Sequence, residues 1–191
     1  MKFIVREIKE LAISTAVLGY VFAWYFAGGI PSIGHVVIAL IGVGSAFVFH
    51  EMAHKFAAQR YGCWAEYRMW DTGLIIAFFS VVVLGIIFAA PGAVYITPGY
   101  YGITTRQNGI ISVSGALANL ALAVIFFVIK LSLGSIPLIN AIASMGVFIN
   151  AWLALFNMIP FPPLDGSKVM AWDIKAWIGV IVVAMGIMSL A

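Results

Sequence analysis

Charged residues are scarce in this sequence, and their scarcity narrows the class of protein. Asp, Glu, Lys and Arg make up 9% of the 191 residues, whereas hydrophobic residues make up 64%. A soluble domain of this length has too little interior to bury that much apolar surface. The composition therefore excludes an ordinary soluble domain and predicts an integral membrane protein that lies in a lipid bilayer.

Cysteine is almost absent as well. The single residue, Cys63, excludes an internal disulfide and a zinc site built from several thiolates. The ten Lys and Arg residues form no basic cluster interleaved with aromatic residues, so nucleic acid is not expected as a partner. Cations scattered between apolar segments are typical of topology signals.

Long apolar runs, in contrast, are abundant. A helix of about 20 apolar residues crosses the hydrocarbon core of a bilayer. Five runs approach this length, and the first has no clear cleavage pattern, so we expect it to be retained. The five predicted spanning helices are Leu11–Ala27, Ile33–Ala58, Gly115–Leu133, Ile136–Ile159 and Ile174–Leu190.

A sixth apolar run, Gly73–Ile96, is interrupted by glycine and proline, which favours a re-entrant or interfacial segment. After it, Thr104–Thr105 and Ile110–Val113 flank the residues 106–109, which end in Asn-Gly, a strong turn signal. We therefore expect a short β-hairpin there, between the core helices. The predicted fold is one domain, residues 1–191: an all-α polytopic membrane protein with five to six membrane helices.

The second apolar run contains the pattern His50-Glu51-Met52-Ala53-His54. Histidines four residues apart on a helix can both direct a ring nitrogen at one zinc ion, and the glutamate between them can handle the protons of a water. An ionisable residue at the centre of a membrane helix costs about 2.5–3.5 kcal/mol, which favours a functional role. The alternative is that these side chains cap the helix and meet water just before Lys55.

A catalytic zinc ion usually takes three protein ligands. The acidic candidates for the third are Glu66, Asp71, Asp165 and Asp173, whereas His35 is expected to be interfacial. Asp165 is favoured because the prolines at 160, 162 and 163 must end the preceding helix and can return an acidic side chain towards the bundle. The alternative is an ordinary proline-rich loop with a solvated Asp165.

The two motifs together, His50-Glu51-x-x-His54 and Asn157-x-x-Pro160-x-x-x-Leu164-Asp165-Gly166, resemble the paired signature of the site-2 protease family of intramembrane metalloproteases. The resemblance extends over residues 33–168 and includes the small-residue stretch 115–119. It implies that His50, His54 and Asp165 bind one zinc ion. It further implies that Glu51 is the catalytic base and that Asn157 assists at the substrate carbonyl.

Two arguments predict which ends of the helices face the cytoplasm: the distribution of Lys and Arg, and the need for the metal ligands to meet. If residues 73–96 re-enter, nine of the ten Lys and Arg residues lie on the cytoplasmic side and only Lys130 lies outside; if they cross, seven of ten do. The N-terminus and the active-site end of a multi-pass protein of the cell membrane are therefore predicted to be cytoplasmic. The metal ligands lead to the same result. Because His50, His54 and Asp165 must meet at one side of the membrane, the chain between residues 60 and 114 must cross it an even number of times, as a re-entrant segment does.

The expected substrates are transmembrane proteins, whose helices must unwind locally before cleavage. Thr104, Ile110 and Ser112 of the predicted hairpin are candidates for pairing with an extended substrate strand. Asn119 is a candidate for lining the substrate path, or else joins helices. Two alternatives stay open: a zinc-binding membrane protein without proteolytic activity, either a transporter or an inactive protease-like chaperone, and a membrane metalloprotease with a glutamate ligand. The oligomeric state is not predicted.

Overall fold

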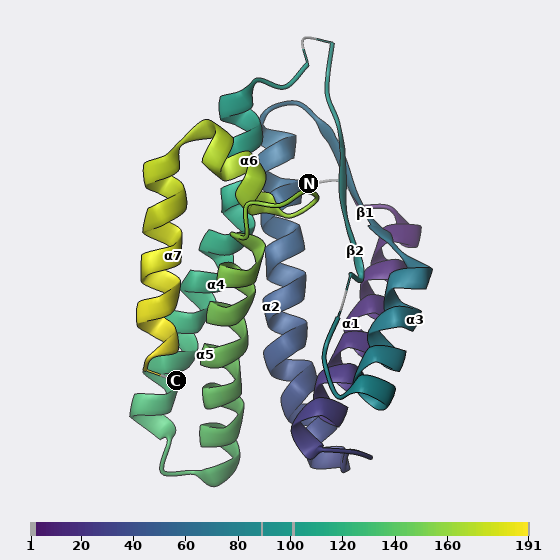
Figure 1. Ribbon diagram of the computed structural model, residues 1–191, viewed down its shortest axis with the longest axis vertical. Coiled ribbons are helices and arrows are strands. Elements are labelled where there is room, and N and C mark those ends of the chain that lie inside the picture. The colour runs from purple at the N-terminus through teal and green to yellow at the C-terminus, as the bar shows by residue number, and fades with distance from the viewer. Residues whose placement is uncertain (1–2, 89, 101, 191) are drawn as a thin grey trace.

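The computed structural model describes residues 3–88, 90–100 and 102–190 and shows a helical bundle with a small sheet on one flank (Figure 1). Among these residues, four helices are long and apolar enough to cross a membrane: α1 (Val5–Ala27), α2 (Ile33–Arg60), α4 (Thr105–Leu133) and α5 (Pro137–Asn157). The shorter elements are α3 (Asp71–Phe79), the π-helical turn η1 (Ser80–Leu84), α6 (Asp165–Trp172), α7 (Ile174–Met188), and the strands β1 (Trp64–Met69) and β2 (Gly92–Thr97).

The four long helices coincide with the first four predicted spans, but the fifth predicted span is not established. Helix α7 has 15 residues and measures about 22 Å at about 1.5 Å per residue, less than the ~30 Å hydrocarbon core. Helix α4 begins ten residues earlier than the predicted run Gly115–Leu133, because its first turns carry polar residues that the hydropathy pattern excluded.

The predicted hairpin over Thr104–Val113 is wrong, because these residues form the start of α4. The Thr104 hydroxyl accepts a hydrogen bond from the Gln107 amide, and the Gln107 side chain accepts one from the Thr104 amide. This reciprocal capping box satisfies the first free amides of the helix, so it outweighs the Asn-Gly turn signal. A Cβ atom at Gly109 would lie 2.3 Å from Cβ of Trp172, so this glycine permits close packing against α6.

In chain order a sheet comes between the core helices α2 and α4, as predicted, but its strands are β1 and β2, which pair antiparallel from Trp64↔Thr97 to Met69↔Gly92. Between them, α3 and η1 run along α1, and the chain then turns at Gly85, whose φ of 67° suits glycine. The segment returns as β2 on the same flank (Figure 1). This shape fits the predicted re-entrant segment better than a crossing.

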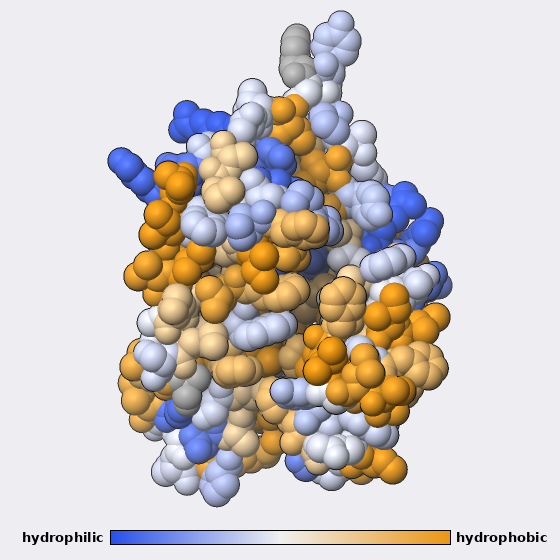
Figure 2. All heavy atoms as spheres, in the orientation of Figure 1, coloured by the Kyte–Doolittle hydropathy of each residue, from blue (hydrophilic) through white to orange (hydrophobic). Residues whose placement is uncertain are grey.

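Helix α2 lies at the centre, with α1 and the sheet on one side and α4 and α5 on the other (Figure 1). One apolar core joins α1, α2 and α5 through Phe22, Val43, Phe47 and Ile149. A second joins α4, α5, α6 and α7. Figure 2 shows that hydrophobic residues cover most of the middle of the visible face, as a bilayer requires.

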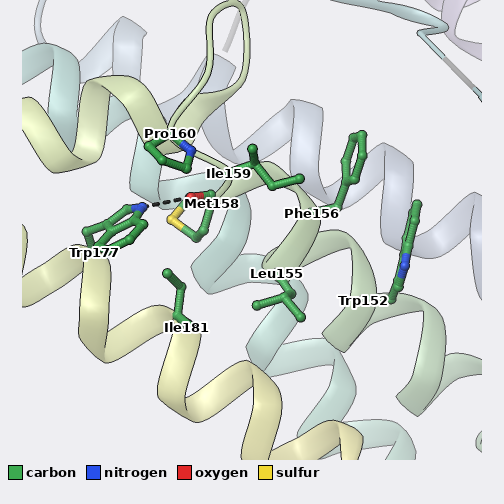
Figure 3. Close-up of a pocket in the computed structure, with 8 residues that line it drawn as sticks. All are labelled: Trp152, Leu155, Phe156, Met158, Ile159, Pro160, Trp177 and Ile181. Carbon is green, nitrogen blue, oxygen red and sulfur yellow. Dashed lines mark hydrogen bonds between the residues drawn. The ribbon is translucent and has the colours of Figure 1, made fainter.

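The end of α5 is held against α7, and this contact fixes the segment that precedes α6. The Trp177 indole N–H donates to the Met158 carbonyl at 2.7 Å, beside an apolar cavity of about 390 Å³ (Figure 3). Trp152 and Phe156 of α5 stack at the far side of this cavity, with ring centroids 5.1 Å apart. The short loop 158–164 therefore starts from an anchored helix end.

Candidate metal centre

Helix α2 presents the two histidines on one face, as their spacing predicts. The Nε2 atoms of His50 and His54 lie 3.0 Å apart, and the ring planes are nearly perpendicular at 88°. Both side chains are buried. His50 lies ten residues and His54 six residues before Arg60, which places them about 15 and 9 Å from the end of the helix. The pair is therefore inside the bundle rather than at a solvated helix end, which argues against the capping alternative.

Asp165 reaches the same point from the first residue of α6. Its Oδ2 atom lies 3.0 Å from Nε2 of His54 and 3.4 Å from Nε2 of His50. A Cβ atom at Gly166 would lie 2.2 Å from the Met158 carbonyl oxygen, so only glycine lets α6 start this close to the end of α5. The acidic side chain thus returns to the bundle, as the proline-rich loop predicted.

The three ligand atoms fit the dimensions of a tetrahedral zinc site. Their separations of 3.0, 3.0 and 3.4 Å compare with about 3.3 Å between ligands at zinc–nitrogen bond lengths of about 2.05 Å. Two imidazoles and one carboxylate leave a fourth position for water or substrate, which is the arrangement of catalytic zinc sites. His50, His54 and Asp165 can therefore hold one such ion.

Both imidazoles are oriented by groups on α4. The Nδ1 atom of His50 lies 2.7 Å from Oδ1 of Asn119, and Nδ1 of His54 lies 2.8 Å from the Ile111 carbonyl oxygen. Because both partners are acceptors, each Nδ1 carries a proton, so each Nε2 is the nitrogen that can give up its proton and present a lone pair to a metal ion. The Asn119 amide also donates to the Ala46 carbonyl and to Asn150, which fixes its own orientation.

Gly115 allows α4 to approach the ligands. A Cβ atom at this position would lie 2.6 Å from Cε1 of His50 and 2.6 Å from Cε1 and Nε2 of His54. Any larger residue would therefore collide with both imidazoles. The small-residue stretch identified in the sequence is thus part of the wall of the centre.

Asp165 is held in the form that a metal ligand needs. Burial opposes its ionisation, but before a metal displaces the Nε2 protons, the protonated imidazoles of His54 and His50 attract and hydrogen-bond the carboxylate, and they hold the pKa of the carboxyl well below its usual value. Lys168, one turn further along α6, contributes a cation 3.5 Å from Oδ1. The side chain is therefore a carboxylate at neutral pH.

Glu51 is buried next to the centre without belonging to the triangle of ligand atoms. Its Oε2 atom accepts a hydrogen bond of 3.0 Å from the Val94 amide of β2. The sheet therefore touches the carboxylate that the motif assigns as a base. This contact was not predicted, because the strands themselves were expected elsewhere.

The other acidic candidates lie in local contacts of their own. Glu66 pairs with Arg68 and accepts a bond from the Trp64 indole, and these two hydrogen bonds lower the pKa of Glu66. Asp173 caps α7 through the amides of residues 175 and 176. Asp71 is in the first turn of α3, and His35 is exposed beside Ser32 at the start of α2.

Four further residues were expected to contact substrate, and this contact stays a prediction, although three of them lie at the start of a helix rather than in the predicted hairpin. Thr104 caps α4, while Ile110 and Ser112 are helical, and Ser112 is buried. None of the three lies on a strand edge. Asn119 is completely buried and joins α4 to α2 and α5, which fits the alternative interpretation of this residue.

Asn157, which was predicted to assist at the substrate carbonyl, is the last residue of α5. Its amide donates to the Leu153 carbonyl of its own helix.

Sequence reasoning missed Lys55 and Glu7. Lys55 was counted among the cytoplasmic cations, at the end of the predicted span Ile33–Ala58, but its side chain is buried against Glu7. Residues 48 positions apart give no local signal of pairing. The one available hint was a lysine directly after the histidine motif, inside an apolar run.

Comparison with known proteins shows which family the chain belongs to. No family model and no solved structure matches the chain. It is 42% identical over 178 residues to the "putative zinc metalloprotease MJ0611" of Methanocaldococcus jannaschii. The alignment covers 92% of this chain and 89% of that protein. It is 27% identical to "putative zinc metalloprotease Rip2" of Mycolicibacterium smegmatis, covering 82% of this chain and 66% of that protein. It is 26% identical to "putative zinc metalloprotease YwhC" of Bacillus subtilis, covering 71% and 67%. With this similarity and its two motifs, the chain belongs to the site-2 protease family of zinc metalloproteases.

Proposed function

We propose that the protein is an intramembrane zinc metalloprotease that holds one zinc ion per chain and hydrolyses peptide bonds of transmembrane protein substrates. One observation carries the proposal: three ligand atoms converge inside a bundle of apolar helices, and an additional buried carboxylate, Glu51, lies beside them. A site for zinc storage or transport needs the ligands but has no use for such a base.

The chemistry follows from the donor set. A zinc ion held by these ligands supplies Lewis acidity, which polarises a carbonyl and makes a water acidic enough to ionise near neutral pH. Glu51 takes the proton of the attacking water on a carboxylate oxygen. It then delivers that proton to the leaving nitrogen as the peptide bond breaks, so that the products are a carboxylate and an amine.

Asn157 has a supporting role in this proposal. It is the last residue of α5, and its amide can rotate away from the Leu153 carbonyl to donate to the carbonyl oxygen of the substrate. A donor placed where negative charge develops stabilises the transition state. Asn157→Ala is therefore expected to lower kcat more than it changes zinc binding.

Substrate recognition is proposed to use the β2 edge and an apolar cavity. The Val94 amide points away from β1 and towards Glu51, so the outer edge of β2 can pair with an extended substrate backbone beside the base. A cavity of about 330 Å³ lies between α1, α2 and α5 and suits the apolar side chains of a membrane-spanning substrate. Its lining includes Leu164, next to Asp165, and Pro91, next to β2.

The orientation is proposed to follow the positive-inside rule, with the N-terminus and the metal centre facing the cytoplasm of a cell membrane. Arg6 near the start of α1, Arg60 at the end of α2 and Arg106 at the start of α4 lie towards one end, whereas Lys130 lies near the other end of α4.

The test uses full-length protein reconstituted in liposomes with a fluorescent reporter peptide of about 20 apolar residues that contains a central Gly-Ala-Gly segment. We expect Glu51→Gln to keep its zinc and to lose cleavage by about 10³-fold, because only the proton acceptor is removed. Asp165→Ala should lose both zinc and cleavage. The exposed variant Lys9→Gln serves as the control and should match the wild type.

Two results would contradict the proposal. Cleavage by Glu51→Gln at the wild-type rate would remove the assigned base. A wild type that binds zinc with full occupancy but leaves the reporter intact would instead favour a zinc-binding membrane protein without proteolytic activity.

A further inference from the structure

The outer edge of β1 is bound by carboxylates of α1. The Tyr67 amide donates to Oε1 of Glu7 at 3.0 Å, and the Met69 amide donates to Oε2 of Glu10 at 2.9 Å. Residues 67 and 69 are two positions apart in the strand, so their amides point to the same side, away from β2. Two side chains of one helix therefore take the place of a third strand.

Glu7 is also half of a buried ion pair. The Lys55 ammonium lies 2.7 Å from each carboxylate oxygen of Glu7 and donates to the Ala65 carbonyl at 2.8 Å. Both side chains are 1% exposed. The pair thus ties α1, α2 and β1 together at a point where neither charge has access to water, and removal of one partner would leave the other uncompensated.

Two side chains on one face of helix α2 form hydrogen bonds to the sheet. Glu51 and Lys55 are four residues apart, so their side chains lie on the same side of the helix. Glu51 binds the Val94 amide of β2, and Lys55 binds the Ala65 carbonyl of β1. Tyr67 and Val94 are cross-strand partners. Glu7 and Glu51 therefore hold the two opposite edges of the same residue pair in the sheet.

We infer that Glu7 and Lys55 are a positioning pair that sets the β2 edge against Glu51, while touching neither metal nor substrate. This inference rests on the proposed function, in which Glu51 takes the proton of the attacking water, and it adds that the carboxylate turns from the Val94 amide to that water. At that moment the contacts through α1 and Lys55 still hold the sheet. The released Val94 amide then stays beside the base, where it can donate to a substrate carbonyl.

The test replaces the ion pair by apolar residues of similar size, Glu7→Leu with Lys55→Met. Such replacements of buried ion pairs are often neutral for stability, so the fold and the zinc content are expected to persist. The bonds to Tyr67 and Ala65 are lost, however. Hydrogen exchange of the amides in Gly92–Thr97 should accelerate by about tenfold. KM for the reporter peptide should rise by about fivefold, with kcat within about twofold.

Matched variants separate positioning from general stability. Glu7→Gln with Lys55→Met also removes both charges, but the amide oxygen at position 7 can still accept from Tyr67. We expect its β2 exchange to lie between the wild type and the Leu/Met variant. Lys9→Met, an exposed change on the same helix, should match the wild type in every measurement.

Wild-type exchange in β2 together with an unchanged KM in the Leu/Met variant would overturn the inference. Acceleration spread over α2 with loss of zinc would also overturn it, because that is the result of a general structural role. If the Leu/Met variant fails to fold, the Gln/Met variant decides: the lost bond to Ala65 should raise β2 exchange by about threefold, and a wild-type rate would contradict the assignment. Exchange is measured without cleavage, so failure of the proposed protease activity is recognised separately.

Discussion

Gly115 shows at the residue scale how little freedom the metal centre has. Its hydrogen atoms face the rings of both histidines, and a methyl group would lie 2.6 Å from each of them. The motif alone predicts which side chains bind zinc. It does not reveal that α4, the fifth element after α2 in the chain, supplies the wall against which both imidazoles are set.

Gly115→Ala is expected to weaken zinc binding by about 10- to 100-fold, because the imidazoles must leave their positions to make room for the methyl group. Zinc affinity can be measured by competition with a chromogenic chelator. Gly179→Ala on α7 is the matched control, since a Cβ atom there meets open space. Equal zinc affinity of Gly115→Ala and the wild type would show that the rings are not confined as described.

For Asn119, the sequence predicts a hydrogen-bonding role but does not predict the partner. A polar amide in an apolar helix predicts a hydrogen-bonded role inside a membrane protein. Whether it faces substrate, another helix or a metal ligand depends on which side of α4 meets α2. The structure assigns it to the Nδ1 atom of His50, an arrangement that local sequence does not encode.

At the scale of elements, the helices were predictable and the sheet was not. Runs of apolar residues long enough to span a bilayer identify α1, α2, α4 and α5, because the bilayer fixes their length. The strands are six residues each and are separated by 22 residues of helix and turn. Their pairing depends on the turn at Gly85 and on the carboxylates of α1, which are far away in sequence.

The start of α4 shows two local signals in competition. Asn108-Gly109 favours a hairpin turn, whereas Thr104 and Gln107 favour a helix start. The helix prevails because Gly109 also packs against Trp172, a contact that a hairpin would lose. A proline substitution at Ile110, which would test a strand edge, would here break a helix at a cost of about 3 kcal/mol.

Gly109→Ala is expected to lower the free energy of unfolding by about 1–3 kcal/mol, because the added methyl group overpacks the contact between α4 and α6. Thermal unfolding in detergent, followed by circular dichroism, measures the change. Gly186→Ala is the control, and its open surroundings predict an unchanged or slightly raised Tm. A Gly109→Ala variant at least as stable as the wild type would argue against this packing.

In the whole molecule, the metal centre lies nearer to one end of the helical bundle than to the other. Helix α1 begins, α2 ends and α4 begins towards the same end, and the metal ligands lie in the half of α2 nearest that end (Figure 1). The sequence predicted this arrangement from the need for both ligand-bearing segments to meet. What it could not predict is the buried contact of Lys55, which removes one cation from those used for the orientation count.

Labelling of single cysteines tests the orientation. In a Cys63→Ser background, Lys130→Cys should react with a membrane-impermeant maleimide in intact cells, because this residue lies in the last turn of α4, at the end that the proposed orientation places outside. Arg106→Cys, at the opposite end of the same helix, should react only after permeabilisation. Reaction of both positions from the same side would contradict a crossing by α4.

The central claim is that two imidazoles and one carboxylate bind a single zinc ion inside the bundle. Zinc K-edge X-ray absorption of the purified wild type, with metal analysis of wild type and Asp165→Ala, tests it most directly. We predict about one zinc ion per chain, nitrogen and oxygen ligands at about 2.0–2.1 Å with scattering from two imidazole rings, and loss of zinc in Asp165→Ala. A sulfur ligand at about 2.3 Å, or full zinc occupancy without the Asp165 carboxylate, would contradict the assignment.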